Sequence, residues 1–420
     1  MKKNILLVGA GGREHAMAWK LAQSRRLGKL YIAPGNPGTA QCGENVSLNV
    51  NDHAALVTFC REKGVELVMV GPEGPLASGL ADDLTGAGIR CFGPGKAAAQ
   101  IEASKIFAKN FMARHNIPTA RYATFAKFSA ALEYVERVDY PIVIKASGLA
   151  AGKGVILPET KEEAEAVLRE MLEGGKFGAA GAEVVIEERL TGAEVSLMAF
   201  SDGRTVKPML PAQDHKRIFD HDLGSNTGGM GAYAPAPILT PELLAEAMQK
   251  VLTPAVNGLR AEGSPFVGVL YAGLMLTPNG MRVLEFNCRF GDPETQAVLP
   301  LLETDLLEIA EACVDGNLAE SEIRWREGAA VCVVLASKGY PEKAEVGKAV
   351  TLGQLPQDSV CFQAGTEIDS DGRLVTVGGR ALNVAAWGQT LPAAVELAYA
   401  AVGQIHFDGM QYRRDIASKA

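Results

Sequence analysis

The stretch YPIVIKASGLAAGKGVIL, residues 140–157, contains two apolar segments separated by a loop rich in glycine. The apolar segments predict two β-strands, and Lys145 and Lys153 lie just before and within the loop. Glycines let backbone N–H groups approach a phosphate closely, and a lysine stabilises the phosphate charge. The stretch therefore indicates a phosphate-binding hairpin, although a mobile surface hairpin uses the same residue types.

Two well-known nucleotide-binding motifs do not fit the chain. The loop differs from a P-loop because Ser147 occupies the place of its first glycine, Gly154 replaces the Ser or Thr, and a strand follows. The N-terminal sequence GAGGRE, residues 9–14, has a glutamate where the dinucleotide fingerprint has its third glycine. The next predicted strand also lacks the terminal acid that binds a ribose. A nicotinamide-dependent oxidoreductase is therefore disfavoured.

The sequence RVLEFN, residues 282–287, predicts a buried strand that carries polar side chains. Side chains alternate along a strand, so Val283, Glu285 and Asn287 are expected on one face. Burying an unpaired carboxylate is costly, so this face needs a partner. A carboxylate and an amide oxygen two residues apart suit Mg²⁺ carried by a nucleoside triphosphate. A buried glutamate paired with a nearby arginine is the alternative.

Composition narrows the class of protein. The 420 residues suggest roughly three domains, and 47% hydrophobic residues are enough for real cores. A net charge of -8 gives no support to nucleic-acid binding. Seven scattered cysteines without a CxxC are typical of reduced thiols in a cytosolic protein. The uncharged residues 263–281 are interrupted by prolines, which suits a core strand better than a membrane span. We expect a cytoplasmic protein without a nucleic-acid or membrane partner.

The first hundred residues repeat one pattern, a short apolar run that ends in glycine, at residues 5–12, 30–38, 67–75 and 89–95. Helical patterns lie between these runs, which predicts a parallel α/β sheet with ligands beyond the carboxyl ends of its strands. Gly9, Gly11 and Gly12 are expected to leave N–H groups open before a helix that begins near Arg13, as an anion-binding site. For any single loop, simple turn formation is the alternative.

The remaining chain alternates between predicted helices, strands and loops. Thr160 and Glu163 form the capping-box signature of a helix that reaches about Leu172. Other expected features are a long polar loop at 214–237, a helical segment at 241–262, a hairpin turn at 369–372 and a terminal helix at 391–405. The pattern changes after Trp325, where we expect a separate C-terminal domain.

Several motifs together resemble the ATP-grasp ligases. They are Lys105, VIKASGLAAGKGV, EERLTGAEVS, NTGGMGAY and LEFNCRFGDPE, in this order. With GAGGREHA and APGNPGTA near the N-terminus, the chain resembles the glycinamide ribonucleotide synthetase (phosphoribosylamine–glycine ligase) family of purine synthesis over nearly its whole length. AQDHKR and NCRFGDPETQ are characteristic of that family, whereas KRIFDHDLGS, residues 216–225, departs from it.

The resemblance implies a multidomain α/β and α+β fold. We expect an N-terminal parallel α/β domain at 1–103 and a small ATP-grasp lobe with a glycine-rich lid at 104–190. A large ATP-grasp lobe with the metal site is expected at 191–325, and a small C-terminal α+β domain at 326–420. We expect a monomer, with a dimer as the alternative.

The resemblance also implies a nucleotide site in which Glu285 and Asn287 bind Mg²⁺ or Mn²⁺. The backbone from Glu187 to Leu190, a short connector between strands, would contact adenine, and Glu194 would accept the ribose hydroxyls; an ordinary exposed acid is the alternative for Glu194. The ATP-binding residues would be Lys105, Lys145, Gly148, Gly152, Lys153, Gly154, Glu187, Glu188, Leu190 and Glu194.

The implied reaction is that of a carbon–nitrogen ligase, in which ATP, glycine and 5-phosphoribosylamine give glycinamide ribonucleotide, ADP and phosphate through glycyl phosphate. Arg289 is expected to brace the phosphoryl group or the glycine carboxylate. Asp292 would orient the loop or the glycine amine, or act only as a turn residue. Asp214 would receive the amine proton.

Substrate-binding residues would be Gly11, Gly12, Arg13, Asn36, Pro37, Gly38, Glu73, Asn226, Thr227, Gly228 and Gly229. The residues between Asn226 and Gly231 are expected to offer backbone amides near the acceptor. Another ATP-grasp carboxylate–amine ligase and a non-catalytic nucleotide sensor are the alternatives.

Overall fold

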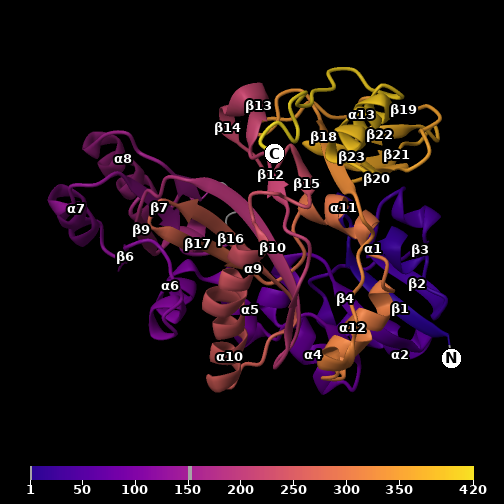
Figure 1. Ribbon diagram of the computed structural model, residues 1–420, viewed down its shortest axis with the longest axis horizontal. Helices are drawn as coiled ribbons and strands as arrows, with labels where there is room; N and C mark the ends of the chain where they lie inside the picture. The colour runs from indigo at the N-terminus through magenta and orange to yellow at the C-terminus, as the bar shows by residue number, and fades with distance from the viewer. Residues whose placement is uncertain (1, 150–153) are drawn as a thin grey trace.

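The computed structural model describes residues 2–149 and 154–420 (Figure 1). Its N-terminal sheet has the strand order β3-β2-β1-β4-β5, with every neighbouring pair parallel, as predicted. The strands are β1 (Lys3–Gly9), β2 (Leu27–Pro34), β3 (Glu44–Asn45), β4 (Val65–Val70) and β5 (Arg90–Phe92). The helices are α1 (Gly12–Leu21), α2 (His53–Lys63), α3 (Glu73–Ser78), α4 (Leu80–Gly86) and α5 (Lys96–Ala103).

A smaller lobe follows, with strand order β6-β9-β7-β8 and its own buried cluster. Its elements are α6 (Lys105–Arg114), β6 (Tyr122–Phe125), α7 (Phe128–Arg137), β7 (Ile142–Ala146), β8 (Val155–Ile156), α8 (Lys161–Leu172) and β9 (Val184–Glu188). β7 and β8 pair antiparallel, which confirms the predicted strand, loop and strand. Thr160 caps α8 by accepting a hydrogen bond from the Glu163 backbone N–H at 3.1 Å. The Glu163 carboxylate accepts from Glu159 rather than from Thr160.

The larger lobe contains a sheet of strand order β11-β10-β16-β17. Its elements are β10 (Ala193–Asp202), β11 (Val206–Pro208), α9 (Pro241–Ala247), α10 (Thr253–Ala261), β16 (Val267–Thr277), β17 (Gly280–Asn287), α11 (Glu294–Val298) and α12 (Leu306–Val314). A π-helical turn at Met248–Leu252 joins α9 to α10.

A β-bulge in β17 corrects one prediction about its faces. Val283 pairs with Leu274, whereas Glu285 pairs with the next residue back, Gly273, so Leu284 is the extra residue. Val283 therefore lies in the same buried cluster as Phe286 and Cys288, not on the face of Glu285. Strict alternation does not foresee a bulge, because an extra residue inverts the side-chain pattern beyond it.

The C-terminal sheet has the order β12-β15-β18-β23-β20, and α13 (Leu391–Val402) packs on β18 and β23. Its strands are β12 (Gln213–Asp214), β15 (Gly231–Ala234), β18 (Ala329–Ala336), β20 (Ser359–Gln363) and β23 (Arg380–Gly388). The predicted hairpin turn joins β21 (Thr366–Ile368) to β22 (Leu374–Thr376). The short strands β19 (Thr351–Leu352) and β24 (Ile405–His406) pair with each other in antiparallel orientation.

The expectation of one long polar loop at 214–237 is wrong. The segment contains the hairpin β13 (Arg217–Phe219) and β14 (Leu223–Asn226), and then β15. Strand β15 forms because β18, which is far away in the sequence, provides an edge with which it pairs.

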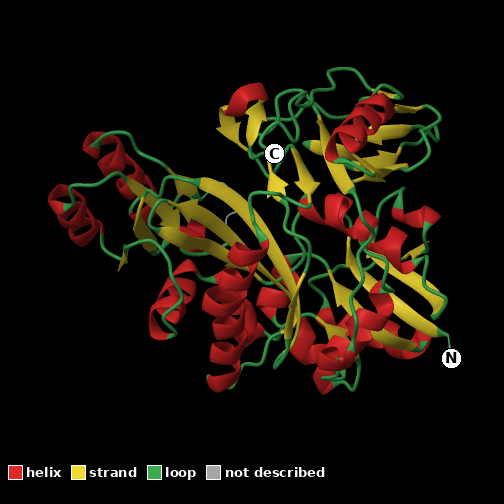
Figure 2. Cartoon of the chain, in the orientation of Figure 1, coloured by secondary structure: helices red, strands yellow, loops and turns green. Residues whose placement is uncertain are grey.

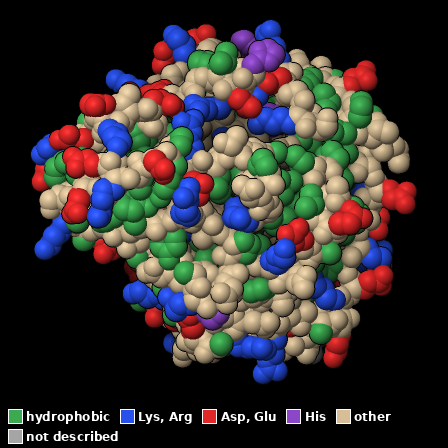
Figure 3. All heavy atoms as spheres, turned by 60° about the vertical axis from the view of Figure 1, so that its left-hand side comes forward, with side chains coloured by type: hydrophobic (Ala, Val, Ile, Leu, Met, Phe, Trp, Pro, Cys, Tyr) green, Lys and Arg blue, Asp and Glu red, His purple; other side chains and the backbone are tan. Residues whose placement is uncertain are grey.

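The small lobe extends away from the N-terminal sheet, and the C-terminal sheet lies above that sheet in the same view (Figures 1 and 2). The C-terminus lies near β12 and β13 rather than at the outer edge (Figure 1). Acidic and basic side chains are interspersed over the face in Figure 3, which shows no broad basic surface. No helix among the described residues is both long and apolar enough to span a bilayer.

Candidate active site

A cavity of about 380 Å³ is lined by residues from the N-terminal sheet region, both lobes and the C-terminal sheet. The structure brings many of the predicted site residues to its wall. These are Arg13, Glu73, Lys105, Lys145, Gly154, Glu187, Asp214, Thr227, Gly228, Glu285, Asn287, Arg289 and Asp292.

Other predicted site residues lie outside the lining. They are Gly11, Gly12, Asn36, Pro37, Gly38, Gly148, Glu188, Leu190, Glu194, Asn226 and Gly229. Gly152 and Lys153 are outside the described residues.

Glu285 and Asn287 stand at the end of β17 with both side chains at the cavity. Burial acts to raise the pKa of Glu285, but Lys216, Lys145 and Lys105 outweigh burial and lower that pKa below its ordinary value. No lysine or arginine nitrogen of the described residues lies within 4.0 Å of this carboxylate. A charged, unpaired carboxylate beside an amide oxygen fits a divalent cation that arrives with triphosphate oxygens.

The alternative partner, an arginine, is engaged elsewhere. The guanidinium of Arg289 pairs with Glu102 at 2.9 Å and with Glu73 at 3.2 Å, and donates to the Phe290 carbonyl at 3.1 Å. Glu102 also accepts a hydrogen bond from the Cys288 N–H at 2.7 Å. Two carboxylates of the N-terminal region therefore fix Arg289 just beyond Glu285 and Asn287.

Several lysines line the cavity near Glu187 and Glu285. Lys145 lies 3.0 Å from the Glu187 carboxylate and donates to the Leu284 carbonyl at 3.2 Å. Lys109, which the sequence analysis missed, pairs with the same carboxylate at 2.8 Å. Burial lowers the pKa of Lys105, whose ammonium donates to the Gly148 carbonyl at 3.4 Å. The ammonium groups of Lys145 and Lys105 thus lie near the loop and near Glu285.

The expected adenine connector begins later than predicted. Glu187 and Glu188 are the last residues of β9, so they lie in a strand and not in the connector. Glu188 pairs with Arg121 at 2.9 Å, outside the cavity wall. The Glu188 backbone N–H donates to the Arg121 carbonyl, which removes it as a free donor.

Lys216 is a second residue that the sequence analysis missed. Its ammonium pairs with Glu194, and the side chain lines the cavity close to Asp214 and Glu285. Burial acts to lower the pKa of Lys216, but the carboxylates of Asp214 and Glu194 raise it by more than burial lowers it. The net pKa lies above its ordinary value, so the side chain is charged. Asp214 and Lys216 are two residues apart in AQDHKR, and this spacing could have indicated that Lys216 lies near the site.

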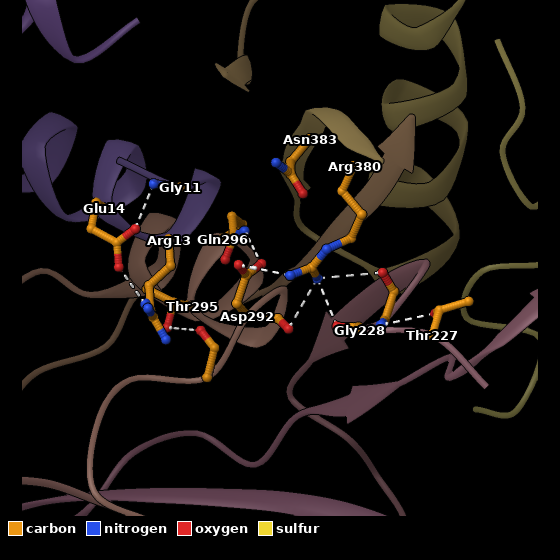
Figure 4. Close-up of polar contacts among 12 residues, drawn as sticks. Gly11, Arg13, Glu14, Thr227, Gly228, Asp292, Thr295, Gln296, Arg380 and Asn383 are labelled. Atoms are coloured by element: carbon orange, nitrogen blue, oxygen red, sulfur yellow. Dashed lines mark hydrogen bonds and ion pairs between the residues drawn. The ribbon is translucent and has the colours of Figure 1, made fainter. Parts of the chain in front are cut away.

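Arginines from different parts of the chain meet at the turn between β17 and α11 (Figure 4). Arg13 donates to the Phe290 carbonyl at 3.2 Å. Arg380, from β23, donates to the Asp292 carbonyl at 3.2 Å and its carboxylate at 3.0 Å, and to the Gly228 carbonyl at 2.6 Å. Burial acts to raise the pKa of Asp292, but Arg380 and Arg13 lower it overall. No motif of the sequence analysis included Arg380.

The expectation of open backbone amides is wrong at Gly11, Gly228 and Gly229. The Gly11 N–H donates to the Glu14 carboxylate at 2.6 Å, so it is not free for an anion (Figure 4). The N–H groups of Gly228 and Gly229 donate to Tyr340 and Thr227 at 2.9 and 3.0 Å. These three donors are therefore already engaged within the protein.

Asn36 shapes the loop after β2. Its side-chain carbonyl accepts hydrogen bonds from the N–H groups of Gly38 and Thr39 at 2.8 and 3.0 Å. Its amide donates to the carbonyls of Ala10 and Gln363 at 2.8 and 2.9 Å. The side chain therefore ties the loop to β1 and to the C-terminal sheet.

Three consecutive parts of the chain match the three domains of the phosphoribosylglycinamide synthetase family. The N domain matches residues 3–102, the ATP-grasp (A) domain residues 103–295 and the C domain residues 330–419. The chain belongs to the phosphoribosylglycinamide synthetase family. An ATP-grasp domain binds ATP together with a divalent metal, and the wall around Glu285 fits that family property.

Relatives of the family match along the whole chain. The phosphoribosylamine–glycine ligase of Mesorhizobium japonicum is 52% identical over 419 residues, 99% of this chain and 98% of that protein. The trifunctional purine biosynthetic protein adenosine-3 of Bos taurus is 50% identical over 429 residues, which is 100% of this chain but 42% of that protein. The crystal structure of the Thermotoga maritima phosphoribosylamine–glycine ligase has a TM-score of 0.87 and 34% identity, covering 99% of this chain and 100% of that one.

Proposed function

We infer that this chain ligates glycine to 5-phosphoribosylamine at the expense of ATP, giving glycinamide ribonucleotide, ADP and phosphate. The observation that carries the inference is the full-length likeness to a protein named for this reaction, 52% identical over 99% of the chain. The protein acts in purine synthesis on small molecules, in the cytoplasm and as a monomer.

The chemistry requires activation of a poor electrophile. An oxygen of the glycine carboxylate attacks the γ-phosphorus of ATP, ADP leaves, and glycyl phosphate forms. The amine of phosphoribosylamine then attacks the acyl carbon and displaces phosphate, which retains the former carboxylate oxygen. The protein contributes orientation and charge neutralisation to both steps.

The nucleotide side of the proposal uses the lysines and the β17 pair. Glu285 and Asn287 would hold Mg²⁺ or Mn²⁺, which neutralises phosphate charge when bound. Lys105, Lys145, Gly148 and Gly154 bind the phosphates, together with Gly152 and Lys153 of the loop. Glu187, Leu190 and Glu194 contact adenosine, and Lys216 holds Glu194 in place.

The acceptor side combines Asp214 with arginines. Burial raises the pKa of Asp214 to about 7, which suits a group that receives the amine proton. Arg289 braces the carboxylate or the phosphoryl group, and Asp292, held by Arg380, orients the loop on the acceptor side.

The sugar phosphate binds at the N-terminal loops and the loop before β15. We assign this role to Gly11, Gly12, Arg13, Asn36, Pro37, Gly38, Glu73, Asn226, Thr227, Gly228 and Gly229. The Gly11, Gly228 and Gly229 amides hold the partners described above, so these residues would shape the loops around the sugar phosphate and not donate to it.

A coupled ADP-release assay in which each substrate is omitted in turn tests the proposal. We expect ADP only when glycine is present, and glycinamide ribonucleotide only when phosphoribosylamine is added as well. ADP release that responds to another carboxylate instead of glycine would favour a different ATP-grasp ligase. The absence of any carboxylate-dependent turnover would favour a nucleotide sensor.

A further inference from the structure

Arg413, close to the C-terminal end, carries a charge but has a side chain only 1% exposed. Its guanidinium forms two bonds with the Asp415 carboxylate, both 2.7 Å long. It also donates to the Asp222 carboxylate at 2.7 Å and to the Arg217 carbonyl at 3.2 Å. A buried charge with this many short contacts is held in one geometry, because losing a partner would leave it unpaired.

These contacts join residues 413–419 to the β13–β14 hairpin. The Arg414 N–H donates to Asp220 at 2.8 Å, and the His221 N–H donates to Asp415 at 2.9 Å. Lys419 pairs with Asp222 at 3.0 Å. His221 and Asp222 have φ of 60° and 55°, a left-handed conformation that is uncommon for residues other than glycine and that surrounding contacts stabilise. The C-terminal segment supplies such contacts at the hairpin turn.

The base of the same hairpin is part of the cavity wall. The N–H and the hydroxyl of Thr227 both donate to the Lys216 carbonyl, at 2.7 and 2.8 Å, and both residues line the cavity. His215, between Asp214 and Lys216, is fully buried against Tyr233 with a ring-centroid distance of 6.1 Å. Burial, followed by the charges of Lys419 and Arg413, lowers the pKa of His215 to about 3.

We propose that residues 413–419 are a positioning element of the active site, in which Arg413 fixes the β13–β14 hairpin and thereby places Lys216 and Thr227 at the cavity. This proposal rests on the function inferred above and adds a requirement to it. Arg413 acts through the hairpin and does not touch the reacting atoms. The segment that it holds, residues 216–225, is the part of the chain that departs from the family pattern.

The test compares Arg413→Met with Arg414→Met, a neighbouring exposed arginine whose side chain donates no hydrogen bond within the described residues. Two quantities are measured at a temperature at which both variants are folded by circular dichroism. They are kcat and KM for ATP and phosphoribosylamine, and amide hydrogen exchange across residues 216–227. We expect a fall of about tenfold or more in kcat/KM for Arg413→Met, together with faster exchange in this segment. Arg414→Met should match the wild type in both quantities.

Arg413→Lys is expected to restore only part of the loss, because an ammonium cannot reproduce the two parallel bonds to Asp415. A folded Arg413→Met protein with wild-type kinetics and wild-type exchange would overturn the proposal. If Arg413→Met does not fold, Asp222→Asn at the exposed turn replaces it, with the same expected direction and the same contradicting result. The exchange measurement decides the matter even if the chain proves to catalyse a different ligation.

Discussion

At the scale of single residues, Glu285 is the side chain on which the nucleotide site depends. It is charged and directed into the cavity, and the described residues give it no direct cationic partner. Nearby lysines keep the carboxylate charged without contacting it directly, which leaves its oxygens available to a divalent cation and is typical of a site kept for function.

Glu285→Gln should therefore lower glycine-dependent ADP release by about 100-fold or more, since the amide cannot neutralise the cation. Steady-state kinetics over a Mg²⁺ titration measures the effect, with the exposed Glu367→Gln as the matched control. Turnover equal to that of the wild type at millimolar Mg²⁺ would remove the metal assignment.

Sequence patterns indicated some site residues and could not indicate others. Glu285 and Asn287 were predictable because polar residues interrupt an apolar strand. Lys109 and Arg380 were not, since a lysine on a helix and an arginine after two glycines are common on surfaces. Only the fold shows that Lys109 pairs with Glu187 and that Arg380 reaches Asp292.

At the scale of elements, strongly patterned segments were predictable and their irregularities were not. The parallel N-terminal strands and the hairpin of β7 and β8 follow from apolar runs that end in glycine. The bulge at Leu284 and strand β15 depend on partners elsewhere in the chain, namely Gly273 and β18. The local sequence around each feature therefore does not predict it.

Helix α1 also provides a test of stability. His15 is buried between α1 and β20, where its ring accepts a hydrogen bond from the Gln363 N–H at 2.8 Å. Burial lowers the pKa of His15 to about 4, whereas an unfolded histidine titrates near 6.5. Between these pH values the unfolded chain binds more protons, so acidification destabilises the fold.

From pH 7.5 to 5 the free energy of unfolding should fall by about 2 kcal/mol more in the wild type than in His15→Asn, which keeps an acceptor but does not titrate. Urea unfolding at several pH values measures the difference. Because His215 is present in both proteins, its contribution cancels. Parallel pH dependences of the two proteins would show that His15 is not buried as a neutral ring.

At the scale of the whole molecule, the cavity exists only because distant segments meet. Residues from the N-terminal region, both lobes and the C-terminal sheet contribute to its wall, and that sheet takes β12 and β15 from the middle of the chain. The order of domains was predictable by resemblance, but the addition of β12 and β15 to the C-terminal sheet was not. Arg380 is the C-terminal contribution that bridges Gly228 and Asp292.

Arg380→Met should lower kcat/KM for phosphoribosylamine by about tenfold or more, while trapping of glycyl phosphate with hydroxylamine changes by less than about threefold. The exposed Arg373→Met, in the β21–β22 hairpin region, is the control. An equal loss in both assays would mean that Arg380 supports the whole site and not the acceptor side.

The most direct test of the account follows oxygen from glycine labelled with ¹⁸O at both carboxylate positions. Activation as glycyl phosphate transfers one labelled oxygen to the released phosphate and leaves the other in the amide carbonyl of the product. We predict one ¹⁸O in each phosphate, measured by mass spectrometry, for every turnover. Phosphate without label, with ADP and the amide still formed, would contradict the account.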